Sequence, residues 1–415
     1  MRNLLLCFLL LIVIRSAAQQ PGSLINRFGT NGTIINTEVC QFYNIGVQPS
    51  GAIIVSREGQ YGGELLRYNA DGSQDLNFGG GRSTKGIAYL HFPQGNYKVN
   101  DMLVQPDGKI VVSTGDKDLF NPGYIFRFNK DGTVDGKFGA SGRVAPDIAG
   151  SSYLHSITLD ASGKIIATGA YQFKSTDKTS LLIAKFNADG TPDFSFNRSG
   201  IRIVLENDGK DYSGAMCRVD GNSAITVLVN GGKDFFLRRF SQDGNIDPEF
   251  GSGNKVSIPP ILGFDVDGTG RIACHDGRNC TIINANGTIG GNYNISNLIE
   301  IKTILFQHNG KILLTRSGGN NFCVEQLNSN GTPDASFGQN GVVLTSFGDN
   351  STAAIKAVVI HDYQIYAAGY VLPPGQNFHG AMAVYQASIP PQKPTMNNKD
   401  LLQKVLNNTN SKTHQ

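Results

Sequence analysis

A degenerate repeat constrains this chain more than any other feature of its sequence. The stretch LNSNGTPDASFGQNG, Leu327 to Gly341, recurs along almost the whole chain as an apolar or aromatic start, a turn and a Phe-Gly step. The copies are anchored by one aromatic residue each, at intervals of 43 to 60 residues: Phe78, Phe138, Phe196, Phe250, Tyr293 and Phe337. A period of this size indicates blades, solenoids or arrays of one supersecondary unit.

A second repeated element lies between successive Phe-Gly steps. Examples are GVQPSGAIIV from Gly46, LVQPDGKIVV from Leu103 and LFQHNGKILL from Leu305. Each has a short apolar strand, a turn and another strand, and Asp-Gly or Asn-Gly supplies the positive φ that two-residue hairpin turns require. A third strand follows each hairpin and a fourth follows each Phe-Gly turn. Seven such hairpins, counting weaker copies, predict an all-β, seven-bladed β-propeller with four antiparallel strands per blade.

The two ends of the repeat region predict how the ring closes. The last hairpin is followed by a third strand, Ala381 to Gln386, but its Phe-Gly turn and fourth strand are missing. That missing piece stands near the N-terminus, where Pro21 to Asn36 matches the turn and fourth strand of a unit without its first three strands. We therefore expect Thr33 to Asn36 to complete the seventh blade, which leaves no open sheet edge between blades.

The segments outside the repeats predict an exported protein. Arg2, the apolar run from Leu4 to Ile14 and the small residues Ser16 to Ala18 have the order of a secretory signal peptide, which spans residues 1–18. The expected propeller covers residues 19–388, and the Pro-, Lys- and Asn-rich residues 389–415 are expected to form a flexible tail. We expect the mature protein to be secreted, extracellular or periplasmic.

Composition argues against several classes of partner. The formal net charge is +3 and the basic residues are scattered, so the sequence lacks the basic face that nucleic acid would need. No later segment is apolar enough to span a bilayer. No phosphate loop, catalytic triad or histidine pair at metal spacing stands out. We expect no cofactor and no metal, a monomeric state, and an unknown protein or carbohydrate as the partner.

The positions of the cysteines allow one possible disulfide bond to be considered. Five remain beyond the signal peptide, an odd number that excludes a complete disulfide framework. Cys274 and Cys280 bracket HDGRN and would form a disulfide if they faced each other across a hairpin. Two unpaired thiols on strands are the alternative.

The repeated aspartates and phenylalanines have structural interpretations. Pairs such as Asp131 with Asp135 lie four residues apart and suggest calcium, but a calcium loop needs about six oxygen ligands. Turn chemistry explains them better, because Asp tolerates the turn and accepts hydrogen bonds from nearby backbone amides. The Phe-Gly rings recur in every copy, as packing between blades requires and a single ligand site does not.

Candidate binding residues lie where the repeat breaks. Loops that join strands two and three, and strand four to the next blade, share one face, which we call the variable-loop face; it would carry Phe120, Tyr171, Phe173 and Tyr370. Residues just before the innermost strands should surround the central channel on that face: Asn44, Asn100, Asp101, His155, Lys302 and Lys356. Two lysines there would repel a divalent cation. A pocket for an anion or polar ligand is one interpretation, and a solvated channel is the other.

The combined pattern of QPDGKIVV, RFN and DGTxDxxFGxxG resembles the delta-60 repeat family of secreted and cell-surface proteins, over about Pro21 to Gln386. The resemblance implies a propeller-like fold and an exported location and carries over no catalytic residue. A more distant similarity to gluconolactonase-type propellers is fold-level analogy. Two functions remain as hypotheses: an exported binding module that uses the variable-loop face, and a lactonase-like hydrolase with its site at the mouth of the channel.

Overall fold

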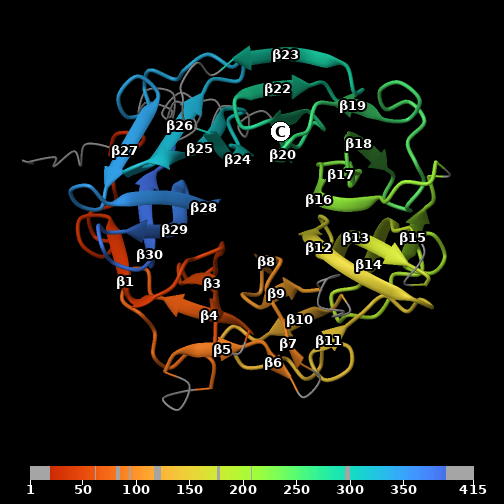
Figure 1. The fold of residues 1–415 in the computed structure, drawn as a ribbon, viewed down its shortest axis with the longest axis horizontal. Coiled ribbons are helices and arrows are strands. Elements are labelled where there is room, and N and C mark those ends of the chain that lie inside the picture. The colour runs from red at the N-terminus through yellow and green to blue at the C-terminus, as the bar shows by residue number, and fades with distance from the viewer. Residues whose placement is uncertain are drawn as a thin grey trace, which may run out of the picture.

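The computed structural model describes residues 19–60, 62–80, 85–92, 95–115, 123–174, 178–206, 208–294 and 300–388, which form a ring of seven blades around a central opening (Figure 1). Blades 1 to 3 consist of β2 (Asn44–Val47), β3 (Ile53–Gly59), β4 (Gly62–Tyr68) and β5 (Ile87–Tyr89); β8 (Asp101–Val104), β9 (Ile110–Ser113), β10 (Ile125–Phe128) and β11 (Arg143–Val144); and β12 (Ser151–Leu159), β13 (Ile165–Gln172), β14 (Ser180–Phe186) and β15 (Ile201–Val204). A short hairpin, β6 (His91–Phe92) and β7 (Gly95–Asn96), lies between blades 1 and 2.

Blades 4 to 7 follow the same order. They consist of β16 (Ser213–Val219), β17 (Ile225–Gly231), β18 (Asp234–Phe240) and β19 (Val256–Ile258); β20 (Gly263–Val266), β21 (Ile272–His275), β22 (Asn279–Ile283) and β23 (Ile289–Asn294); β24 (Glu300–Phe306), β25 (Ile312–Gly319), β26 (Asn321–Leu327) and β27 (Val342–Ser346); and β28 (Thr352–His361), β29 (Gln364–Leu372), β30 (His379–Gln386) and β1 (Thr33–Val39). Every pairing between these strands is antiparallel, as the sequence predicts. No helix in the described ranges is long and apolar enough to cross a bilayer.

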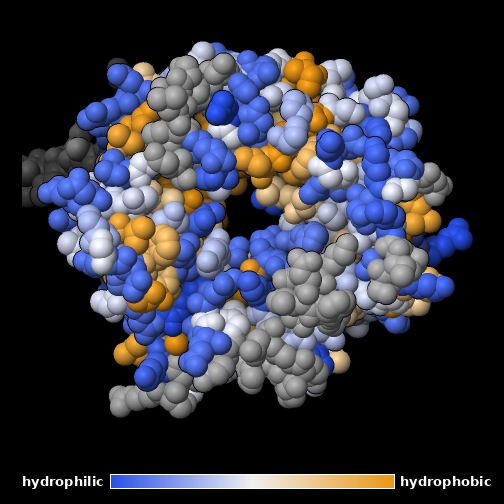
Figure 2. All heavy atoms as spheres, viewed as in Figure 1, coloured by the Kyte–Doolittle hydropathy of each residue, from blue (hydrophilic) through white to orange (hydrophobic). Residues whose placement is uncertain are grey.

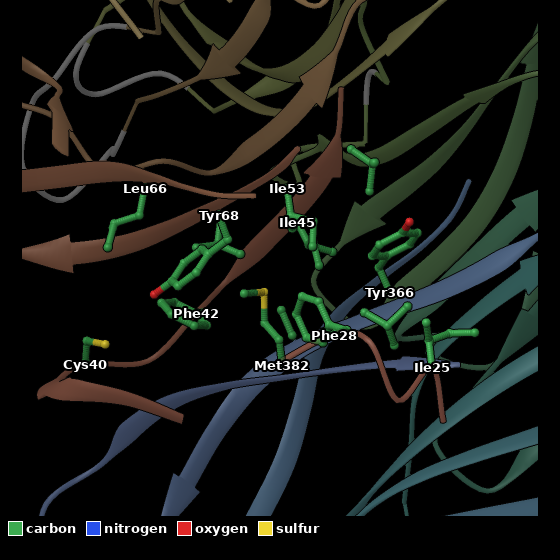
Figure 3. Close-up of a cluster of buried hydrophobic side chains, with 14 of the residues drawn as sticks. Ile25, Phe28, Cys40, Phe42, Ile45, Ile53, Leu66, Tyr68, Tyr366 and Met382 are labelled. Carbon is green, nitrogen blue, oxygen red and sulfur yellow. The ribbon is translucent and has the colours of Figure 1, made fainter. Parts of the chain in front are cut away.

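Ring closure takes place as predicted. β1 pairs with β30 in the register Thr33 to Ala383 and Ile35 to Ala381, so the N-terminal segment is the fourth strand of blade 7. Phe28 from the same segment is buried against blade 1 (Figure 3). β25 and β28 also pair directly, which joins blades 6 and 7 into one sheet, and the sequence gives no sign of this contact.

The hairpin turns differ in type from the prediction. In blade 2 the amide of Gly108 donates to the carbonyl of Gln105 (2.8 Å), and the amide of Gln105 donates to the carbonyl of Lys109 (2.8 Å). Only Gly108 in this loop has positive φ (84°), so the turn is a three-residue loop with its glycine at the left-handed position. A two-residue turn with both φ values positive occurs in blade 7, at Asp362 and Tyr363.

The Phe-Gly aromatics form the interfaces between blades. Each of the seven interfaces has its own apolar cluster. Phe78 and its counterparts are at most 1% exposed, and Tyr293 takes the same place between blades 5 and 6. The ring of Phe78 covers Gly132 in the Asp-Gly turn of the next blade, where an added Cβ would lie 2.7 Å from the ring. The Phe of one blade therefore requires the Gly of the next.

A backbone hydrogen bond repeats beside these rings. The residue after each Phe donates its amide to the carbonyl that precedes the turn glycine of the next blade. The donors and acceptors are Gly29 to Asp71, Gly79 to Asp131, Gly139 to Asp189, Asn197 to Asp243, Gly251 to Asn286 and Gly338 to Pro21, at 2.7 to 3.1 Å. Since Pro21 precedes Gly22, the N-terminal segment contributes the turn of blade 7 as well as its fourth strand.

The aspartate pairs are structural, as the turn interpretation predicts. In blade 2 the Oδ1 atom of Asp131 accepts from the amide of Thr133 (3.0 Å), and Asp135 accepts from the amide of Lys137 (3.2 Å). The other oxygen of Asp135 forms ion pairs with Arg127 (2.8 Å) and Lys109 (3.0 Å). Both carboxylates are thus occupied by the blade itself.

Of the two alternatives for Cys274 and Cys280, the disulfide is wrong and the unpaired thiols are present. Both thiols are free and buried. Across the β21–β22 hairpin, Cys274 lies opposite Thr281, and Cys280 lies opposite His275. The two side chains therefore point to opposite faces of the sheet, Cys274 into the interface with blade 4 and Cys280 into the interface with blade 6. No disulfide can join them in this register.

Candidate functional site

The innermost strands carry β-bulges that place one side chain per blade at the same end of the channel. In blades 3, 4, 6 and 7 the register shifts at His155, Ala215, Lys302 and Lys356, so each of these is the extra residue of a bulge in the first strand. In blades 1, 2 and 5 the equivalent residue of the first strand donates its amide to a carbonyl on the second strand. The residue that carries this carbonyl is already paired with the following residue of the first strand, so two residues face one. A bulge redirects the extra side chain. We call these seven residues the mouth ring: Tyr43, Asn100, His155, Ala215, Leu262, Lys302 and Lys356.

The mouth ring opens into a cavity along the axis of the propeller. This channel cavity has a volume of about 640 Å³, and all seven members of the mouth ring line it. A side cavity of about 480 Å³ adjoins it on blades 7, 1, 2 and 3, and shares Tyr43, Asn44, Asn100, His155 and Lys356 with it. Figure 2 shows the central opening, whose border is hydrophobic beside β20 and hydrophilic beside β8. Both volumes fall in the range of small-molecule sites.

The six channel residues expected from the sequence all line the channel cavity. Asn100, His155, Lys302 and Lys356 belong to the mouth ring, whereas Asn44 and Asp101 lie one position deeper. Asn44 donates to the hydroxyl of Ser56 (2.9 Å). Whether these residues bind a ligand stays a prediction, but the ring arrangement that the sequence implies is present.

Asn100 has a structural bond as well as a place in the mouth ring. Its amide nitrogen donates to the carbonyls of Gly115 (2.7 Å) and Leu154 (2.8 Å), which links blades 2 and 3. The Oδ1 atom is then the part of this side chain that can accept a hydrogen bond from a ligand.

Two partly buried carboxylates and one guanidinium lie deeper in the channel. Asp101 accepts hydrogen bonds from the hydroxyl of Ser156 (2.9 Å) and the amide of Ile157 (3.0 Å). Asp265 accepts from the amide of Phe306 (2.8 Å) and lies 3.3 Å from Arg218. Burial raises the pKa of both aspartates, and Arg218 opposes that rise in each case. Each carboxylate is therefore held by the neighbouring blade rather than directed at a common point.

The two lysines of the mouth ring differ in their surroundings. Lys302 forms an exposed ion pair with Glu300 at 2.7 Å. Lys356 lies over the ring of Tyr370 at 5.5 Å, and Tyr370 packs edge-to-face on Phe378 with ring centroids 4.9 Å apart. Among the cations that line the two cavities in the described part of the chain, Lys356 alone has no carboxylate within 4.0 Å.

The aromatic residues predicted on the variable-loop face are not all brought together. Tyr370 lies beside Lys356, as described above. The hydroxyl of Tyr171 donates to the carbonyl of Ala149 (2.9 Å), and Phe173 is 54% exposed, but neither lines the channel or the side cavity. Phe120 lies outside the described residues.

Sequence reasoning missed Tyr43, Ala215, Leu262, Arg218 and Asp265. Ala215 and Leu262 stand in blades 4 and 5, where the hairpin repeat is weakest, so the alignment of copies did not extend to them. Both residues could have been found by aligning the first strands of all blades on their shared apolar residues and then comparing the position two residues earlier. Arg218 and Asp265 were missed because charged residues within a strand are usually assigned to the face of the strand that contacts solvent.

No group of three or more His, Cys, Asp or Glu side chains able to hold a metal occurs in the portions of the chain that the structure covers. Tyr43, Asn100 and His155 can exchange hydrogen bonds with a ligand, the lysines can attract negative charge, and Ala215 with Leu262 offer apolar contact. The arrangement is one of recognition groups around a rigid opening.

Comparison with known proteins agrees with the fold. The model of the domain of unknown function (DUF5122) beta-propeller matches residues 48–78, 105–138, 161–196, 219–250 and 307–337. No curated protein matches the chain in sequence.

Similar solved structures are also propellers. A catalytically inactive virginiamycin B lyase from Staphylococcus aureus with quinupristin has a TM-score of 0.55 at 15% identity, covering 85% of this chain and 98% of that one. YCF48 bound to D1 peptide has a TM-score of 0.52 at 9% identity, covering 91% and 100%. The WD40 repeats of RRP9 have a TM-score of 0.52 at 8% identity, covering 88% and 99%. At these identities the likeness establishes the fold alone.

Proposed function

We propose that this protein is an exported binding module whose ligand occupies the mouth ring on the variable-loop face. The observation that carries the proposal is the chemistry of the seven bulges. Their backbone positions are equivalent, yet they hold Tyr, Asn, His, Ala, Leu and two Lys side chains around one cavity. Positions that serve packing in this chain, such as the Phe-Gly aromatics, are nearly uniform from blade to blade.

The scaffold suits such a role. The strands that present the mouth ring belong to blades whose interfaces are fully buried, so the side chains start from fixed backbone positions. Fixed positions reduce the entropy lost when a ligand binds. Function on a rigid frame with variable loops is the usual division of labour in repeat folds.

Export enters the proposal from the sequence. The order of Arg2, the apolar run to Ile14 and the small residues before Gln19 supports cleavage after Ala18. The resemblance to the delta-60 repeat family supports the same location, and we propose that the chain is a member of that family.

The hydrolase hypothesis receives less support. A lactonase-like site needs acidic or amide side chains that converge on one reacting atom. Asp101 and Asp265 instead bond to the backbone of the next blade, and Asn100 bridges two carbonyls. The likeness to a lyase is a likeness of fold and brings no catalytic residue to this chain.

Thermal unfolding against a panel of sugars, lactones, short peptides and divalent cations tests the proposal. A ligand at about one hundred times its dissociation constant adds about 2.7 kcal/mol of stability. We expect a stabilising compound to lose its effect in the double variant His155→Ala with Lys356→Ala. Phe194→Ala is the matched control, since Phe194 is 69% exposed in a turn on the opposite face.

Two results would count against a binding module with its site at the mouth ring. Stabilisation that survives the double variant, or that falls equally in Phe194→Ala, would place the site elsewhere. Turnover of a lactone that disappears in Asp101→Asn would establish the hydrolase instead.

A further inference from the structure

The mouth ring is chemically divided by blade, and the division indicates a class of ligand. Resting on the binding function proposed above, we infer that the site takes a small amphiphilic carboxylate. Its negative charge lies between Lys302 and Lys356 on blades 6 and 7, and its apolar group lies against Ala215 and Leu262 on blades 4 and 5.

The charged side of the site depends on Lys356. This lysine is exposed, lines both cavities and has the Tyr370 ring rather than a carboxylate beside it. Lys302 comes from the neighbouring blade and shares its charge with Glu300. An incoming carboxylate thus meets one uncompensated ammonium and one that can divide its hydrogen bonds between two acceptors.

The acidic residues deeper in the channel do not pair with Lys356. Asp265 has Arg218 at 3.3 Å, and Asp101 is bonded to Ser156 and Ile157 of the next blade. Glu58 at the side cavity pairs with Lys98 at 3.2 Å. Each of these carboxylates has its own partner, so in the described part of the chain Lys356 is the mouth-ring ammonium that has no carboxylate within 4.0 Å.

The apolar side of the site lies on blades 4 and 5, next to the charged side. Ala215 and Leu262 occupy successive bulges, and Leu262 is 54% exposed although its neighbours in β20 are buried. The border of the opening beside β20 is hydrophobic in the space-filling view (Figure 2). Five of the other six blades fill this position with polar groups, and covering the exposed leucine with an apolar part of a ligand would stabilise the complex.

The third side of the ring supplies orientation. Tyr43, Asn100 and His155 lie on blades 1 to 3, and the Oδ1 atom of Asn100 can accept a hydrogen bond. An N–H group between the carboxylate and the apolar group of the ligand would meet that acceptor. The cavity of about 640 Å³ accommodates such a molecule whole.

Calorimetric titration of the full chain with three matched probes tests this inference. N-acetyl-leucine carries both features, N-acetyl-leucinamide lacks the charge, and N-acetylglycine lacks the apolar group. We expect N-acetyl-leucine to bind about tenfold more tightly than either of the others, which corresponds to about 1.4 kcal/mol. The preference over the amide should weaken as salt rises, because ions screen the lysines.

Variants separate the two halves of the site. In Lys356→Gln the preference for the acid over the amide should fall to about threefold or less, with the preference for leucine over glycine retained. In Leu262→Ser the reverse should hold. Lys137→Gln removes the same charge from an exposed turn on the opposite face and should leave both preferences unchanged.

The outcomes distinguish this inference from the proposed function. Equal binding of the acid and the amide would refute a carboxylate ligand, and equal effects of Lys356→Gln and Lys137→Gln would refute the assignment of the charge. If uncharged members of the sugar or peptide panel bind at the mouth ring while no probe does, the binding function stands and this inference fails. If no compound of either set depends on the mouth ring, both fail.

Discussion

His275 should make the protein lose stability in mildly acidic solution. The residue ends β21, where its side chain is 1% exposed, and neither ring nitrogen has a hydrogen-bond partner among the described atoms. Burial lowers the pKa of His275 from 6.5 to about 4, against the opposing charges of Asp276 and Glu300 and with the help of Lys302. The folded protein therefore holds this imidazole neutral over a range in which the unfolded chain protonates it.

The sign and size of the effect follow from that difference in pKa. Because the unfolded state binds the extra proton, stability is complete above a pH of about 6.5 and falls as the pH drops towards 4. Between about pH 7 and about pH 4.5 the loss from this residue is roughly 2 kcal/mol, since one pKa unit corresponds to about 1.36 kcal/mol.

Urea denaturation of wild type and His275→Leu at the two pH values measures this loss. Leucine is a reasonable replacement because Leu228 occupies the equivalent position of blade 4. The other titrating groups are common to both proteins, so the difference between the two pH dependences isolates His275. His308→Leu, at an exposed turn position, should follow the wild type. If wild type and His275→Leu lose the same stability on acidification, the reasoning from burial is wrong.

Two further predictions concern the ring itself. Gly132→Ala should destabilise the fold by about 1 to 3 kcal/mol more than Gly163→Ala in denaturant titration, because both glycines have positive φ but only the first has a ring 2.7 Å from the new Cβ. Equal losses would show that the Phe-to-Gly contact does not limit this position. Deleting residues 19–36 should expose the edge of β30 and cause aggregation, as judged by size-exclusion chromatography. A truncated chain that remains monomeric and equally stable would contradict closure by the N-terminal strand.

The blade architecture was accessible from the sequence because its determinants are local. An Asp-Gly turn with its Phe-Gly step specifies a blade within about fifteen residues, and the chain repeats that information with little change. Closure followed because the incomplete units at the two ends complement each other, as Thr33 and Ala383 now show. Resemblance to a repeat family added confidence in the fold but gave no information about the ligand.

The type of hairpin turn and the pairing of the cysteines could not be predicted from the local sequence. Asp-Gly suggested a two-residue turn, but the hydrogen bond from the amide of Gln105 to the carbonyl of Lys109 encloses a loop of three residues. Cys274 and Cys280 are close in the chain, yet the register places them on opposite faces. Both outcomes depend on which residues pair across the hairpin. A difference of one residue in this register moves a side chain to the other face of the sheet.

The channel site divides in the same way between sequence and structure. Spacing alone indicated that Asn100, His155, Lys302 and Lys356 would converge, because each precedes an innermost strand. The bulges, the contribution of Ala215 and Leu262, and the partners that occupy Asp101 and Asp265 required the folded ring.

The sequence by itself thus determined the blade, the number of blades and the way in which the ends meet, since turns and apolar strands are properties of short segments. The tertiary structure decided which side chains share the mouth of the channel and which charges there remain unpaired. Those properties arise only when seven segments distant in the chain are brought to one axis, where a single extra residue in each first strand redirects a side chain into the opening.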